Sequence, residues 1–214
     1  MGGRGASSGG SAGGGGSGSG GSVNPLSTTS LISAREDQRT EVDQSLTVFR
    51  DVESRYGVRV YDIQLAQLGP KDAGTLAYYS SGDNVAINQA YFDAAKMDKV
   101  YDRSVQSGFH PSRGNKSGIE AVTAHELGHK LTQQIGVNNG EGAWAVDKVA
   151  GRIVSRAARD AGYKNQAQLR AKISGYGKMN NAEAVAEAFA DVYCNGAKAS
   201  RESRAIINVL NSYF

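Results

Sequence analysis

The segment 119–135, IEAVTAHELGHKLTQQI, places the strongest constraint on this chain, because it is typical of a helix and carries two histidines four residues apart. Side chains four apart on a helix lie one turn above one another on the same face, so His125 and His129 can reach a single metal ion. Ser117 is a suitable N-cap, and Glu120 three residues later would complete a capping box. The segment therefore predicts a metal-binding helix.

The residue types in this segment indicate a hydrolytic site. Zinc suits two neutral imidazoles and a carboxylate, and a site with three protein ligands keeps a fourth position open for water. Glu126 follows the first histidine directly and can reach such a water without being a ligand, which is the placement of a general base. The alternative is a helix with two ordinary histidines. The apolar flanking residues and a second motif favour the metal site.

The second motif is AEAVAEAFAD, residues 182–191. It places Glu183, Glu187 and Asp191 along one side of a helix whose other positions are mostly alanine. A zinc ion with two histidine ligands needs a third ligand, and those histidines need acceptors for their second ring N–H, so two carboxylates four apart can serve as ligand and orienter. The alternative is a solvent-facing acidic stripe. Such a stripe is expected to carry Lys or Arg partners, and this helix has none.

Together the two motifs resemble those of the gluzincin metallopeptidases, particularly the family of the anthrax lethal factor protease domain. HELGH (125–129) is followed by GYGKMNNAEAVAEAFAD (175–191). This matches the family order of HExxH, a tyrosine in a glycine-containing loop, an asparagine and a helix of the form ExxxExF. The resemblance covers these two segments only. It implies a zinc endopeptidase with a zincin-like fold.

The resemblance also implies a role for each matching residue. His125, His129 and Glu183 would be the zinc ligands. Glu126 would be the general base, and Glu187 would accept a hydrogen bond from a ligand imidazole.

The third ligand can also be assigned in a second way. Thermolysin-like gluzincins use ExxxD, which Glu187 and Asp191 fit as ligand and orienter. The first assignment is preferred because it also accounts for Asn180 and for Tyr176, which would donate its hydroxyl to the oxyanion.

The N-terminal residues form a separate region by composition. The first 22 residues contain 12 Gly and 6 Ser, a composition that cannot bury apolar surface. They also lack the apolar core of a signal peptide. We expect a disordered Gly/Ser-rich tail over residues 1–24, acting as a tether or without a role of its own, and one zincin-like domain over residues 25–214.

Apolar periodicity in the rest of the chain predicts an α+β fold. A strand is expected over 58–68, and a hairpin over 74–80 and 84–88. Helices are expected over 34–56, 91–105, 142–161, 166–173, 182–194 and from 200 onward. We expect a small mixed sheet packed on the HELGH helix, with a helical C-terminal half. One hairpin strand would be an edge beside the metal, open to an added substrate strand, or the edge would be covered.

Several other classes of protein and site are disfavoured. The net charge of +3 is too small to indicate nucleic acid binding, and no apolar run is long enough to span a membrane. Cys194 is the only cysteine, which excludes an intramolecular disulfide. His110 could contact a substrate or an oxyanion. A loop histidine before a proline is more often exposed, so we expect an exposed side chain there.

The sequence therefore predicts a zinc-dependent endopeptidase acting on a peptide or protein. The alternative is a zinc-stapled structural or interaction module without protease activity. The opening MGGRGASS resembles glycine-rich stretches in head-associated proteins of tailed phages, some of which carry zincin domains. This resemblance, with the absence of a signal peptide, implies a cytoplasmic or virion-associated protein with phage structural proteins as partners. A separate hypothesis is a toxin or effector aimed at a host protein, which the sequence does not separate from a self-processing or housekeeping role.

Overall fold

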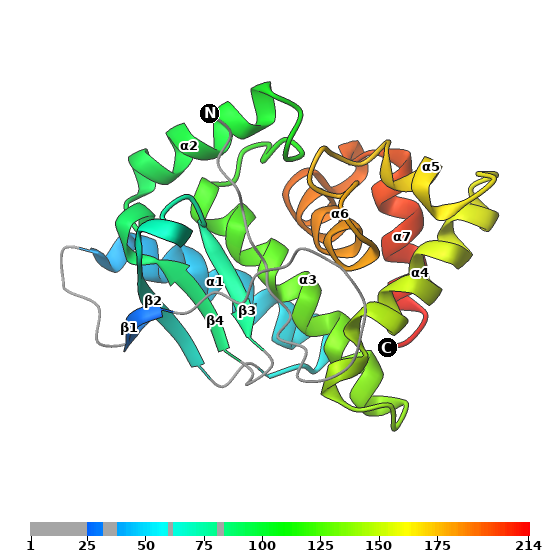
Figure 1. Cartoon of the computed structure of the whole chain (residues 1–214), viewed down its shortest axis with the longest axis horizontal. Coiled ribbons are helices and arrows are strands. Elements are labelled where there is room, and N and C mark those ends of the chain that lie inside the picture. The colour runs from blue at the N-terminus through cyan, green and yellow to red at the C-terminus, as the bar shows by residue number, and fades with distance from the viewer. Residues whose placement is uncertain (1–24, 32–37, 60–61, 81–83) are drawn as a thin grey trace.

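A computed structural model describes residues 25–31, 38–59, 62–80 and 84–214, and the expected tail over 1–24 lies outside this part. A four-stranded mixed sheet lies on one side of a long central helix, α3 (Gly118–Asn138), and most of the remaining helices lie on the other side (Figure 1). The expected α+β class and the helical second half are confirmed. No helix in the described ranges is long and apolar enough to cross a membrane.

The described part of the sheet places an edge strand beside α3. Its strands are β1 (Pro25–Ser30), β2 (Asp62–Leu68), β3 (Ala77–Ser80) and β4 (Asn84–Asn88), in the order β1-β2-β4-β3. The expected pairing of β3 with β4 is confirmed as antiparallel, and β4 runs parallel to β2. β3 is therefore an edge strand, and it contacts α3. β1 was not predicted, because its sequence PLSTTS is polar and mostly exposed and so lacks the apolar alternation of a buried strand.

The described helices follow the predicted pattern, with ends that differ by a few residues. The expected start of the first helix, at 34–37, lies outside the described residues. They are α1 (Arg39–Tyr56), α2 (Ala94–Gln106), α4 (Val146–Asp160), α5 (Gln166–Arg170), α6 (Asn181–Asn195) and α7 (Arg201–Asn211), besides α3. Short 3₁₀ turns lie at Pro70–Asp72, Gln89–Tyr91, Ala143–Ala145 and Gly196–Lys198. The turn at Ala143–Ala145 explains why α4 starts later than predicted.

The central helix α3 is buried on nearly all its faces. From Gly118 to Gln133 every residue except Glu120 is buried. Leu127 and Leu131 pack into the core shared with α4, α6 and α7, whereas Ile119 packs into the core beneath the sheet and α2. A helix that contacts protein all round holds its side chains in fixed directions. The predicted capping box of Ser117 and Glu120 fixes its start.

A glycine allows α3 and α6 to approach closely. A Cβ placed on Gly128 would lie only 2.7 Å from Cα of Ala186 and 3.1 Å from Cβ of Phe189. Gly128 lies between His125 and His129 in the sequence, and Ala186 lies between Glu183 and Glu187. The backbone contact therefore brings the histidine turn of one helix against the carboxylate turn of the other.

This packing predicts opposite effects for two glycine substitutions. Gly128→Ala should destabilise the protein by about 1–3 kcal/mol, because backbone atoms must move to admit the methyl group. Gly151 is the matched control: it lies within α4, and the nearest atom to an added Cβ is 3.7 Å away. Gly151→Ala should stabilise the protein by about 0.5–1 kcal/mol through helix propensity. Urea denaturation of both variants measures the difference, and equal effects would contradict the close helix contact.

Candidate metal centre

Three buried side chains from α3 and α6 form a group that can hold a metal ion. Each of His125, His129 and Glu183 offers one ligand atom, and these atoms all lie within 4.8 Å of one another. Oε2 of Glu183 lies 3.2 Å from Nε2 of His125 and 3.4 Å from Nε2 of His129. The two imidazoles thus meet the carboxylate of the neighbouring helix, as the spacing of the motifs predicted.

The distances within this group fit a metal site. Oε2 of Glu183 is buried and makes no hydrogen bond within the described residues, although both ring nitrogens are near. Ligands about 2.0–2.1 Å from a tetrahedral ion lie about 3.3 Å from one another. The separations of Oε2 from the two nitrogens match this value. A buried oxygen left without a hydrogen bond is costly, and coordination would satisfy it.

Glu187 orients His125 from the side of the ring opposite Glu183. Its Oε1 lies 2.8 Å from Nδ1 of His125 and 2.9 Å from Nδ1 of His110. Its Oε2 accepts a hydrogen bond from the Ser174 hydroxyl at 2.7 Å. A carboxylate only accepts, so His125 donates through Nδ1 and presents the lone pair of Nε2 to a metal. Glu187 therefore takes the orienting position expected for it.

The loop that carries Tyr176 is tied to the loop that carries His110. The backbone N–H of Gly175 donates to the carbonyl of Gly108 at 2.8 Å, and that of Tyr176 donates to the carbonyl of Phe109 at 2.9 Å. A Cβ on Gly175 would meet this neighbouring backbone at 3.1 Å. The buried ring of Tyr176 stacks on His125, with centroids 5.6 Å apart. Tyr176 is thus beside the metal group, as predicted.

The prediction that His110 is exposed is wrong. The side chain is buried, bonded to Glu187 and stacked on Tyr101 with ring centroids 5.3 Å apart. The misleading signal was Pro111, which marks a loop but not its exposure. The neighbouring Phe109, an aromatic residue in an otherwise polar loop, was the signal that this segment packs inward.

Glu126 lies beside the metal group without belonging to it. It is buried, and its Oε2 makes no hydrogen bond within the described residues. Burial raises the pKa of its carboxyl from 4.5 to about 7, although the nearby histidines oppose the shift. The side chain lines a recess together with His110 and Tyr176. A carboxyl with a pKa near neutrality can both take and return a proton.

The carboxylates and His125 hold opposite charges in the metal-free state. Burial alone would raise the pKa of Glu183, but His129 and His125 outweigh it and lower the pKa to about 2. The pKa of Glu187 is lowered in the same way by His110 and His125, against the effect of burial. Burial would lower the pKa of His125, yet the neighbouring Glu183 and Glu187 hold it well above 6.5. A bound cation would replace the proton on His125.

Asp191 lies one turn beyond Glu187, and its hydrogen bonds are directed elsewhere. Its carboxylate accepts from the side chain of Asn195 at 2.8 Å and from the backbone N–H of Ser200, the N-cap of α7, at 3.0 Å. The second of these bonds links α6 to the start of α7. The geometry therefore favours Glu183 as the third ligand over the alternative pair of Glu187 and Asp191.

No protein-family model, curated protein or solved structure matches this chain. The gluzincin assignment consequently stays a prediction from the two motifs, and the geometry of the site carries the functional argument.

The two possible third ligands can be separated by metal titration. Glu183→Ala should abolish tight binding of zinc, because it removes a ligand atom. Glu187→Ala should weaken binding by roughly 10–100-fold, because it releases only the orientation of His125. Isothermal titration of each variant, with circular dichroism as the control for folding, measures both effects. Full zinc affinity in Glu183→Ala would show that the ligand assignment is wrong.

The stability of the metal-free protein should fall as pH rises above about 5. Between pH 4.5 and about 7 the folded state keeps a proton on Glu126 that the unfolded state has lost, and above pH 6.5 it keeps one on His125. Rising pH therefore favours the unfolded state. Below pH 4.5 stability instead rises with pH, because the pKa of Glu183 is lowered in the folded state. Urea midpoints from about pH 3 to pH 8 measure this profile. Zinc-loaded protein is the control, and metal-free stability that rises from pH 5 to pH 8 would contradict it.

Proposed function

We propose that this protein is a zinc-dependent endopeptidase with a zincin-like fold. The observation that carries the proposal is Glu126, a buried carboxyl beside a group that can hold a metal ion. Its pKa is raised to about 7, and its Oε2 has no hydrogen-bond partner among the residues that the structure describes. Two imidazoles and one carboxylate are a donor set that suits zinc and leaves a coordination position open. The combination supports hydrolysis more than metal storage.

The residues around the metal group have separate tasks in this proposal. Zinc, when bound, supplies a Lewis acid that polarises the peptide carbonyl and makes water more acidic. Glu126 takes the proton from the attacking water and returns it to the leaving amine. Tyr176, held beside His125, donates its hydroxyl to the oxyanion that develops on the carbonyl oxygen.

The edge of the sheet supports a peptide as the substrate. Ala77, the first residue of β3, lines the same recess as Glu126, and Leu76 precedes it there. β3 is an edge strand of the sheet. An extended peptide can add to such an edge through main-chain hydrogen bonds, which places its backbone beside the metal group.

We also propose a cytoplasmic or virion-associated setting with phage proteins as partners. This part of the proposal rests on the glycine-rich N-terminal sequence.

The alternative function is a module in which the metal only stabilises the fold. His125, His129 and Glu183 would be enough for that role. A staple has no use for a further acidic group beside its three ligands, and burying Glu126 with no partner for Oε2 among the described residues has an energetic cost. This cost is explained if the carboxylate meets a substrate or water during catalysis.

Cleavage of a degenerate peptide library, read by mass spectrometry, tests the proposal. Zinc-loaded wild type should cleave peptides, and Glu126→Gln should lose cleavage while keeping the fold and zinc, because the amide cannot accept the proton. Zinc titration and circular dichroism of Glu126→Gln are the controls. Turnover retained by Glu126→Gln would rule out this mechanism, and no cleavage by zinc-bound wild type would favour the zinc-stapled module.

A further inference from the structure

We propose that His110 is a substrate-binding residue whose Nε2 forms a hydrogen bond with the main chain of the bound peptide beside the cleaved bond. The inference rests on the proposed function, because it assigns a further contact at the same site. It does not follow from the HExxH and ExxxE motifs, which do not include this loop.

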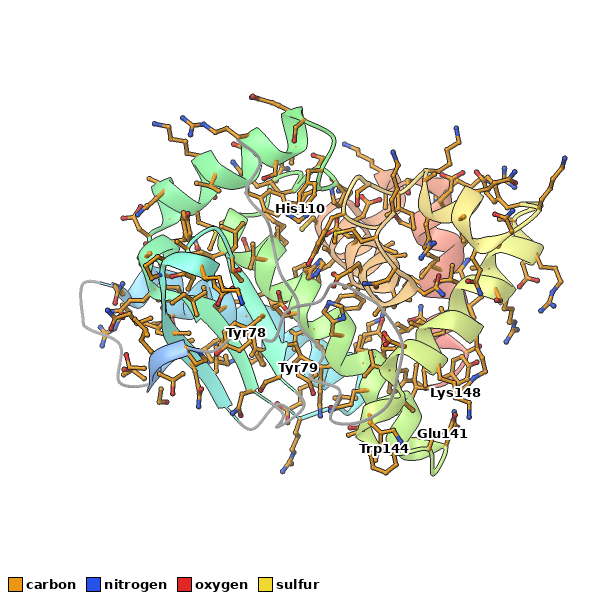
Figure 2. All side chains as sticks on the ribbon, viewed as in Figure 1. Tyr78, Tyr79, His110, Glu141, Trp144 and Lys148 are labelled. Atoms are coloured by element: carbon orange, nitrogen blue, oxygen red, sulfur yellow. The ribbon has the colours of Figure 1, made fainter. Side chains whose placement is uncertain are left out.

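The ring of His110 is held from several directions. Its Nδ1 lies 2.9 Å from Oε1 of Glu187, and one face stacks on Tyr101 at an interplanar angle of 10°. The ring of Tyr176 meets it edge-on, with centroids 5.5 Å apart. Figure 2 shows His110 in the region between α2 and α6. With Nδ1 committed to a carboxylate and the ring plane fixed by two aromatic neighbours, the direction of Nε2 is fixed as well.

Nε2 is the ring atom left to meet a ligand. It makes no hydrogen bond with any group in the described ranges, whereas Nδ1 is paired. The ring also lines the recess that Glu126 and Tyr176 line. A histidine with a purely structural role in a protein interior generally has both nitrogens satisfied. An extended peptide offers N–H and C=O groups along its length, so it can meet Nε2 whether this atom accepts or donates.

One carboxylate oxygen connects the metal group to this contact. Oε1 of Glu187 lies within hydrogen-bond distance of both His110 and His125, whose rings meet edge-on with centroids 6.3 Å apart. The shared acceptor fixes the separation between a metal-binding imidazole and the proposed substrate contact. Accurate placement of this kind is what a reacting peptide bond requires.

The main competing explanation is that His110 only holds Glu187 in place and does not contact the substrate. Two amide variants distinguish these explanations. In His110→Asn the amide nitrogen falls near the place of Nδ1, so a donor to Glu187 is kept and the group at Nε2 is lost. In His110→Gln the amide falls near the place of Nε2. Ser174→Ala is the matched control, because it removes another donor to Glu187 without changing His110.

The experiment measures binding to the zinc-loaded full chain, so that it does not depend on turnover. The probes are acetohydroxamate, which reaches only the metal, and a dipeptidyl hydroxamate, which also extends along the peptide-binding recess. His110→Asn should weaken the dipeptidyl probe roughly 10-fold and leave acetohydroxamate and zinc affinity unchanged. His110→Gln should recover most of the loss. Ser174→Ala should not discriminate between the two probes.

Three results would overturn the proposal. Equal weakening of both probes, or loss of zinc affinity, in His110→Asn would show that His110 acts through Glu187. Unchanged binding of both probes in both His110 variants would show that Nε2 contacts no ligand. If neither hydroxamate binds the zinc-loaded wild type, the open coordination position of the proposed function fails, and the His110 contact falls with it.

Discussion

The close contact between α3 and α6 at Gly128 and Ala186 is the constraint on which the site depends. Helix axes normally lie 8–10 Å apart, and larger side chains at the contact widen the separation. Here the absence of a side chain at Gly128 lets Oε2 of Glu183 come within 3.2 Å of Nε2 of His125. The alanines of α6 serve the same end, since they fill little space around the carboxylates. The close approach of α3 to α6 therefore explains why the second motif is rich in alanine.

This contact brings several buried carboxylates together, and they differ in how many hydrogen bonds they accept. Glu187 accepts from two histidines and from Ser174, and it is the best satisfied carboxylate of the site. Within the described part of the chain, Oε2 of Glu126 and Oε2 of Glu183 are buried without a hydrogen bond. A protein that satisfies one buried carboxylate threefold and leaves two others incomplete directs its unpaired polar atoms toward ligands.

The parts of the fold and the site that follow local periodicity were predictable from the sequence. The positions of His125, His129 and Glu183 depend on the helical repeat, and the capping box and the β3–β4 hairpin depend on residues close in sequence. What could not be predicted depends on contacts between distant segments. β1 pairs with β2 through its backbone and carries no apolar pattern. His110 is buried because its loop pairs with the loop of Tyr176, which lies far along the chain from it.

The central claim is that α3 and α6 together form a zinc site with an open position, and diffraction from crystals of the zinc-loaded protein at the zinc absorption edge tests it most directly. The account predicts one anomalous peak, about 2.0–2.2 Å from Nε2 of His125, Nε2 of His129 and an oxygen of Glu183. It also predicts that Glu187 stays outside the coordination sphere, bonded to the two Nδ1 atoms. A peak coordinated by Glu187 and Asp191, or no zinc at the histidines, would contradict it.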